Sequence, residues 1–114
     1  MNSVIDGIQR FLDLTAFRQR LVSSNIANVD TPGYRTRDVA FQSELRRAMA
    51  SPTATTPATH KVPGLVARPD GNDVSVDRES MLLAETQLQF RTGVELLRSE
   101  FRRTLLAINE GKQS

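Results

Sequence analysis

The chain has 114 residues, which is enough for one domain and too few for a two-domain enzyme. Hydrophobic residues make up 39% of the chain, but with 5 Phe, 1 Tyr and no Trp the large rings that fill a compact core are scarce. The 15 basic and 13 acidic side chains nearly cancel, and their signs alternate along the sequence. This composition predicts an elongated protein with solvated charged faces and argues against a phosphate-binding surface.

The absence of cysteine excludes disulfides, thiolate metal sites and cysteine nucleophiles, and it leaves the redox compartment open. Asp6, Arg10 and Asp13 interrupt the apolar runs near the N-terminus. We therefore expect neither a cleaved signal peptide nor a membrane span. If the protein leaves the cytoplasm, it does so by an uncleaved route.

The first thirty residues carry a helical pattern. Two rows of mainly apolar residues recur at intervals of seven, as the a and d positions of a heptad do. The rows consist of Ile5, Leu12 and Ile26, and of Ile8, Thr15, Val22 and Val29. They predict a long amphipathic helix within residues 1–30, whose polar Thr15 and Gln19 indicate a polar neighbour or a register device.

Residues 31–50 are predicted to hold a turn and a short helix. Pro32 fixes its own φ and Gly33 is free to adopt a positive φ, which is the combination of a type II turn. Residues 35–39 are expected to be extended. Asp38 is the expected N-cap of a helix that ends near Ala50.

Residues 51–72 are interpreted as a flexible linker. They contain four of the five prolines and a run of threonines, and no helical or strand period survives in them. Residues 61–62 and 65–66 could pair briefly, but we assign no strand to them. His60, the only histidine, is expected to be a free surface imidazole.

Residues 73–111 are predicted to form the second long helix. Asp77 is its expected cap, Glu79 favours the helix dipole in the first turn, and Gly111 is the expected stop. Gly93 in the interior indicates a close helix approach. The heptad rows here are Leu83, Phe90, Leu97 and Thr104, and Gln87, Val94, Phe101 and Ile108.

These elements predict an all-α fold: one elongated helical domain over residues 1–114 in which the two long helices form an antiparallel, coiled-coil-like pair. A short helix and the Pro/Thr-rich linker join them. The predicted seams are Ile8, Leu12, Val22 and Ile26 on the first helix, and Leu83, Phe90, Val94, Leu97 and Phe101 on the second. Such a pair buries little surface by itself, so the predicted function is assembly with other subunits.

We predict no catalytic, cofactor or metal site. A lone histidine without cysteine lacks metal partners, and residues 70–73 lack the ligand spacing and closing Glu of a calcium loop. The alternative function is a basic helical nucleic-acid-binding or adaptor protein that uses a cluster of four arginines. That cluster, interrupted by Asp38 and Glu44, consists of Arg35, Arg37, Arg46 and Arg47.

Three stretches carry a resemblance to a known family. Residues 23–34, SSNIANVDTPGY, resemble the N-terminal signature of the bacterial flagellar rod and hook proteins. Residues 37–45 and 70–79 are similar to the proximal-rod members of that family. The likeness spans about residues 10–109 apart from the linker, which is short for the family, and Ser75 stands where relatives often carry an acidic residue.

The resemblance implies a structural subunit of the proximal rod in the flagellar basal body. It implies export through the flagellar type III apparatus without a cleaved signal peptide, and a place in the periplasmic rod. The implied partners are other rod proteins, the rod-base adaptor, the membrane ring protein and the export gate. The subunit is expected to self-associate in a helical assembly through its terminal helices.

Two sets of residues are candidates for these roles. The first, which we call the turn motif, is expected to support assembly rather than monomer stability, the alternative being that it only terminates the helix. It consists of Asn25, Ile26, Asn28, Thr31, Pro32, Gly33 and Tyr34. Phe17 and Leu21 match a Phe-x-x-x-apolar export signal, but Phe41 to Leu45 and Phe101 to Leu105 match it too, and ordinary i, i+4 packing explains all three.

Overall fold

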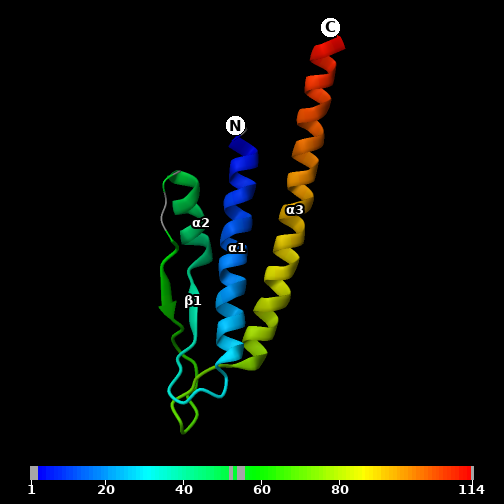
Figure 1. Cartoon of the computed structure of the whole chain (residues 1–114). Coiled ribbons are helices and arrows are strands. Elements are labelled where there is room, and N and C mark those ends of the chain that lie inside the picture. The colour runs from blue at the N-terminus through cyan, green and yellow to red at the C-terminus, as the bar shows by residue number, and fades with distance from the viewer. Residues whose placement is uncertain (1–2, 52, 54–55, 114) are drawn as a thin grey trace.

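The computed structural model describes residues 3–51, 53 and 56–113 of the chain. Its elements are α1 (Ser3–Ala27), β1 (Arg37–Val39), α2 (Phe41–Ala50), β2 (Thr59–Lys61) and α3 (Val76–Gln113). The molecule measures 71 × 25 × 18 Å. α1 runs toward the loops at one end of the molecule, and α3 returns antiparallel to it, so the chain begins and ends on the side away from the loops (Figure 1).

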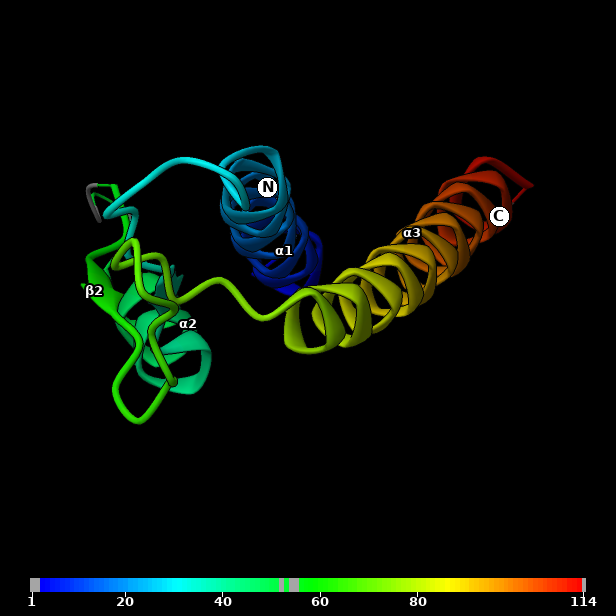
Figure 2. The same ribbon diagram turned by 90° about the horizontal axis from the view of Figure 1, so that it is seen from below.

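α1 is the central layer of the molecule. α3 packs on one of its sides, and α2 with the two strands lies on the other (Figure 2). The rings of Phe11 and Phe41 meet edge to face with their centroids 6.0 Å apart. The buried apolar side chains are few: Ile5, Leu14, Val22, Val39, Phe41, Val74 and Leu82. The apolar core is thin because, among the described residues, the buried polar and charged side chains slightly outnumber these apolar ones, and the polar groups require partners inside the protein.

The two short strands form an antiparallel sheet with Arg37 opposite Lys61 and Val39 opposite Thr59. The prediction of an all-α fold is therefore wrong in this respect, and the fold is mostly helical with one small sheet. The Arg37 guanidinium donates to Thr59 Oγ1 at 2.9 Å, and the Val62 N–H donates to the Thr36 carbonyl at 3.0 Å. A strand of three residues carries no period of its own, so its formation depends on this distant partner.

The ends of α3 differ from the sequence prediction. Ser75, not Asp77, caps the helix, since its Oγ accepts the Arg78 N–H at 3.2 Å. At the other end α3 continues through Gly111 to Gln113. The prediction that Gly111 stops the helix is therefore wrong.

The predicted cap of α2 is also wrong. The N-cap is Ala40, which has no side-chain capping bond. Asp38 is instead buried, and its Oδ1 accepts the Val39 N–H at 2.7 Å. The Asp38 carboxylate therefore bonds to other elements of the chain, as described below, and does not cap α2.

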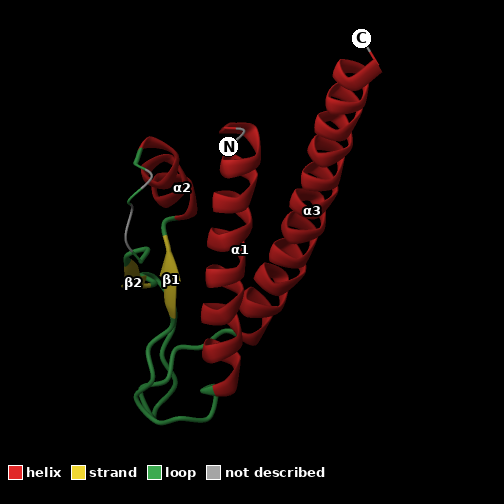
Figure 3. Cartoon of the chain, turned by 45° about the horizontal axis from the view of Figure 1, so that its top comes forward, coloured by secondary structure: helices red, strands yellow, loops and turns green. Residues whose placement is uncertain are grey.

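α3 packs closely against α1 where it carries Gly93. A Cβ added there would lie 2.6 Å from Leu12 Cδ2 and 3.3 Å from Phe11 Cδ1. The expected close helix approach at this glycine is therefore confirmed. Farther along, α3 diverges from α1 and projects beyond its first residues (Figure 3). Among the described residues, no helix has the length and apolar character needed to cross a membrane.

Candidate functional site

The loops at the closed end of the helix pair bring together two segments that are far apart in the sequence. Asn72, fully buried, donates through Nδ2 to the carbonyls of Asn28 and Thr31, both at 2.8 Å. The Gly33 N–H donates to the Asp70 carbonyl at 2.8 Å. Residues 70–75 therefore hold the turn that follows α1.

The turn itself has the predicted geometry. Gly33 has a φ of 75°, and the Tyr34 N–H donates to the Thr31 carbonyl at 3.2 Å. Gly71 also has a positive φ, 86°, and a Cβ on it would lie 3.3 Å from the Gly33 Cα. Two backbones thus pass each other at a distance that only glycine accommodates without strain.

Asn25 lies where α1 meets both β1 and α3. Its Nδ2 donates to the Arg37 carbonyl at 2.9 Å and to Glu79 Oε1 at 2.6 Å. Its Oδ1 accepts the Tyr34 hydroxyl at 2.9 Å and the Arg37 N–H at 3.2 Å. Both donors and both acceptor positions of the amide are filled within the subunit, so Asn25 connects three elements of one chain.

Asp38 is the centre of a buried ionic cluster. Arg18 of α1 binds it through two bonds, Nε to Oδ1 at 3.0 Å and Nη2 to Oδ2 at 2.9 Å. Arg78 of α3 donates to the same Oδ2 at 2.7 Å and to Glu79 Oε2 at 2.6 Å. We call these four side chains the ionic cluster. Two cations and two carboxylates balance, which removes the penalty that an unpaired buried charge would carry.

The environment of Asp38 also determines its protonation. Burial raises the pKa of Asp38, but the hydrogen bonds from Arg18 and the Val39 N–H and the Arg18 charge outweigh it. The pKa therefore lies below the usual 3.8, and the carboxylate is ionised at neutral pH.

Asp73 is a second buried carboxylate in the same loops. Its Oδ1 accepts the Thr36 N–H at 2.6 Å and its Oδ2 accepts Arg35 Nε at 3.0 Å. Burial raises the pKa of Asp73, and the hydrogen bonds of Thr36 and Arg35 outweigh it and hold the pKa below 3.8. Asp73 thus ties the strand side of the molecule to the residues that precede α3.

The rest of the turn motif divides between the interior and the surface. Ile26, Asn28 and Tyr34 are half-buried, whereas Thr31, Pro32 and Gly33 are exposed. Asn28 bonds locally: its Nδ2 donates to the Ser24 carbonyl at 2.8 Å and its Oδ1 accepts the Thr31 hydroxyl at 3.0 Å. The role of the motif in assembly stays a prediction.

Sequence reasoning missed the partners of this motif. Asn72 and the ionic cluster were not candidates, although residues 70–79 were noted for their resemblance. The available signal is a run of short polar side chains directly before a long helix. Nothing local indicates that such residues bond to a helix end more than forty residues earlier.

The predicted seam residues lie at various depths. On α1, Val22 is buried and Ile8, Leu12 and Ile26 are half-buried. On α3, Leu83, Val94 and Leu97 are half-buried, whereas Phe90 and Phe101 are exposed. The α3 positions that the structure buries most deeply are Glu79, Leu82, Thr86 and Gly93.

This placement leaves a row of large apolar side chains along one flank of α3. We call it the α3 stripe, and it consists of Phe90, Phe101, Leu105 and Ile108. These residues are between 38% and 60% exposed, and they recur at intervals of three, four, seven or eleven residues on one helix face. An exposed apolar row of this kind on one helix face is typical of an interaction surface.

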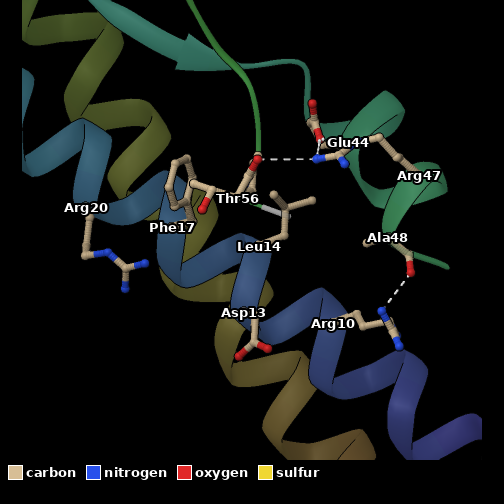
Figure 4. Close-up of a pocket in the computed structure, with 10 residues that line it drawn as sticks. Arg10, Asp13, Leu14, Phe17, Arg20, Glu44, Arg47, Ala48 and Thr56 are labelled. Carbon is tan, nitrogen blue, oxygen red and sulfur yellow. Dashed lines mark hydrogen bonds and ion pairs between the residues drawn. The ribbon is translucent and has the colours of Figure 1, made fainter. Parts of the chain in front are cut away.

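A cleft of about 360 Å³ lies between α1 and α2, on the side away from α3 (Figure 4). Leu14, Phe17 and Pro57 provide apolar lining. Around them lie Arg10, which donates to the Ala48 carbonyl at 2.9 Å, and Arg47, which donates to the Thr56 carbonyl at 3.5 Å. Most of the polar groups around the cleft have intramolecular partners.

The candidate export pair is close to this cleft. Phe17 lines it and lies under the Arg20 guanidinium, 5.7 Å from its ring centroid. Phe17 and Leu21 are both half-buried. The positions of Phe17 and Leu21 in the folded subunit do not test an export role, so the export signal stays a prediction.

The described part of the chain contains no candidate metal site. No three His, Cys, Asp or Glu side chains there gather in a way that could hold a metal ion. His60 is exposed on β2.

Comparison with known proteins gives a consistent result. Residues 12–35 match a protein family described as "Flagella basal body rod protein". Over 134 aligned residues the chain is 32% identical to the flagellar basal body rod protein FlgB of Yersinia enterocolitica, covering 94% of this chain and 97% of that protein. FlgB of Salmonella typhimurium is 32% identical over 125 residues, with 90% and 91% covered. FlgB of Cereibacter sphaeroides is 37% identical over 111 residues, with 85% and 87% covered.

The family match over residues 12–35 makes this elongated helical subunit similar to the class of flagellar basal body rod proteins. The near full-length similarity narrows the class, and the chain belongs to the FlgB family of flagellar basal body rod proteins. It is a structural component of the basal body, not an enzyme. The nucleic-acid alternative finds no support among these comparisons.

Proposed function

We propose that this subunit is a building block of the proximal rod and joins its neighbours through the terminal helices. The α3 stripe carries the proposal, because it is a row of large apolar side chains that the subunit does not cover. Full burial of an exposed side chain of this kind contributes about 1.5–3 kcal/mol, and these side chains are between 38% and 60% exposed, so a neighbour that covers them gains roughly half of that for each. We interpret residues 1–114 as one elongated domain built around the helix pair.

The proposed partners are other rod proteins, the rod-base adaptor, the membrane ring protein and further copies of this chain. The proposed location is the periplasmic part of the basal body, reached through the export gate without a cleaved signal peptide. Phe17 and Leu21 are proposed as an export signal that the unfolded chain presents. In the folded subunit both are half-buried, which is compatible with use before folding.

The test of the stripe compares matched polar substitutions. Leu105→Ser with Ile108→Ser removes two stripe residues, while Leu88→Ser removes an equally exposed leucine from another face of α3. Each variant gene replaces the native gene in a motile bacterium that makes this protein, and basal bodies are isolated and counted. We expect the stripe variant to lose rods and motility and the Leu88 variant to keep both.

Folding is checked in the same variants by circular dichroism of the purified subunits. Because all three side chains are exposed, the substitutions should leave helicity unchanged. Normal rods in the stripe variant would refute the proposed interface, whereas loss of rods in both variants would mean that the α3 face with Leu88 is also needed for assembly.

The nucleic-acid alternative has a direct test. Two of its four arginines are engaged by acidic groups of the same chain, Arg35 with Asp73 at 3.0 Å and Arg47 with Glu44 at 2.8 Å. We therefore expect no salt-sensitive retention of the protein on immobilised DNA. Retention that falls steeply with added salt would revive that function.

A further inference from the structure

We propose that Asp38 is a positioning residue for assembly: by holding Arg18 of α1 and Arg78 of α3 on one carboxylate, it sets the register and direction of α3. The inference rests on the proposed function, because its consequence is the angle at which the α3 stripe meets a neighbouring subunit. It assigns the ionic cluster a task other than stability.

The first step is that a single carboxylate joins the two long helices. The Asp38 side chain is 6% exposed, and its Oδ2 accepts Arg18 at 2.9 Å and Arg78 at 2.7 Å. Asp38 itself belongs to neither helix but to β1, whose backbone is tied to β2. Arg18 of α1 and Arg78 of α3 are thus both bound to one residue of β1, which belongs to neither helix.

The second step is that the ionic cluster defines the register of the helices together with the close packing of Leu12 against Gly93. The buried α1–α3 zone includes Thr15 and Thr86, and Gly93 contributes no side chain. A slide of one helical turn is about 5.4 Å, which would break every bond between Arg78 and Asp38. The ionic cluster therefore distinguishes the native register from its neighbours, a use of buried polar groups with precedent in coiled coils.

The third step is the distance along α3 from its contact with Asp38 to its exposed C-terminal part, because a small change of angle at the contact becomes a large displacement there. Asp38 contacts α3 at its first turn, and Ser99 lies 21 residues farther along, a distance of about 32 Å at 1.5 Å per residue. A change of about 10° in the direction of α3 at Arg78 would move Ser99 by about 5 Å. α3 diverges from α1 toward its C-terminal end and projects past the start of α1 (Figure 1). A small error at the cluster therefore becomes a large error at the stripe.

The experiment measures the helix geometry directly. The chain has no native cysteine, so Asp13→Cys and Ser99→Cys, both at exposed positions, accept spin labels without interference. Electron–electron distances are recorded on the purified, frozen subunit in the parent, in Asp38→Asn and in Asp38→Glu. We expect one narrow distance in the parent, a broadened or shifted distribution in Asp38→Asn of about 5 Å, and partial return in Asp38→Glu, which keeps the charge.

The matched control is Leu14→Ala, a buried apolar truncation on the α2 side of α1 that leaves the ionic cluster intact. If Asp38 merely stabilised the fold, both variants would behave alike at a temperature where both are folded. Positioning predicts instead a narrow native distance for Leu14→Ala and loss of basal bodies for Asp38→Asn alone. An unchanged distance in Asp38→Asn, or equal broadening in Leu14→Ala, would overturn the inference.

A second variant keeps the proposal testable if Asp38→Asn fails to fold. Arg78→Lys keeps the positive charge but cannot bridge Asp38 and Glu79 with a planar fork. We expect it to retain helicity and to broaden the distance, and a native distribution in this variant would also count against the proposal. The distance is read on the isolated subunit, so it remains decisive even if the stripe variants show that the proposed interface is wrong.

Discussion

Replacement of Asn25 by alanine tests whether the end of α1 is held from within the subunit. The side chain is 1% exposed, and its loss leaves Glu79 Oε1, the Tyr34 hydroxyl and both backbone groups of Arg37 without their partner. A hydrogen bond to a charged group contributes about 1.5–3 kcal/mol and a neutral one about 0.5–1.5. Tyr34 is half-buried and recovers a bond to water, so we expect a net loss of about 3–4 kcal/mol.

Asn28→Ala is the natural comparison, because it removes the same amide one turn away. Asn28 is half-buried, and its two side-chain bonds, to the Ser24 carbonyl and the Thr31 hydroxyl, are exposed. Water replaces them, so the expected loss is below about 1 kcal/mol. A chain of this length has a total stability of about 6–17 kcal/mol, so only the Asn25 change should be a large fraction of it.

Urea unfolding followed by far-UV circular dichroism measures both values on purified subunits. Equal losses in the two variants, or a loss below about 1 kcal/mol for Asn25→Ala, would refute the assignment of Asn25 to subunit stability. Rod yield in the same variants addresses the turn motif. Loss of rods in Asn28→Ala without loss of stability would support its predicted role in assembly, and normal rods would leave it a helix end.

Three further predictions follow from the packing and the charges. The pKa values of Asp38 and Asp73 lie below the unfolded value near 3.8, so their contribution to the free energy of unfolding is complete above that pH and is lost as the pH falls below it. An acid titration of helicity should be flat from neutral pH down to about 5, and an earlier decline would contradict this reasoning. Gly93→Ala gains about 1 kcal/mol of helix propensity but overlaps Leu12, so we expect a net loss of up to about 2 kcal/mol. In thermal melts the Leu12→Ala/Gly93→Ala double variant should be more stable than the sum of the single changes, and simple additivity would argue against the close contact. Amide exchange in the dilute subunit should be slow at residues 79–93 and fast at 102–113, which project past α1, and uniform protection along α3 would show that the projecting part is stable alone.

The amino-acid sequence by itself determined the features whose causes are local. Pro32 and Gly33 restrict the backbone directly, so the turn after α1 follows from those two residues wherever they stand. The two long helices follow from apolar periods sustained over many turns, which no alternative secondary structure satisfies. The turn signature was also enough to indicate the family.

Tertiary structure decided the features in which one group could contact several alternative partners. Asp38 had the position of a helix cap, but two guanidiniums from distant helices bind a carboxylate more strongly than backbone N–H groups do. The large apolar residues of α3 predicted its inner face, yet the close approach at Gly93 and the bond from Asn25 to Glu79 turn smaller residues inward and leave the stripe outside. β2 formed because Arg37–Val39 presents an open strand edge to it. In each case the deciding energy lies between residues that are tens of positions apart, and no local pattern encodes it.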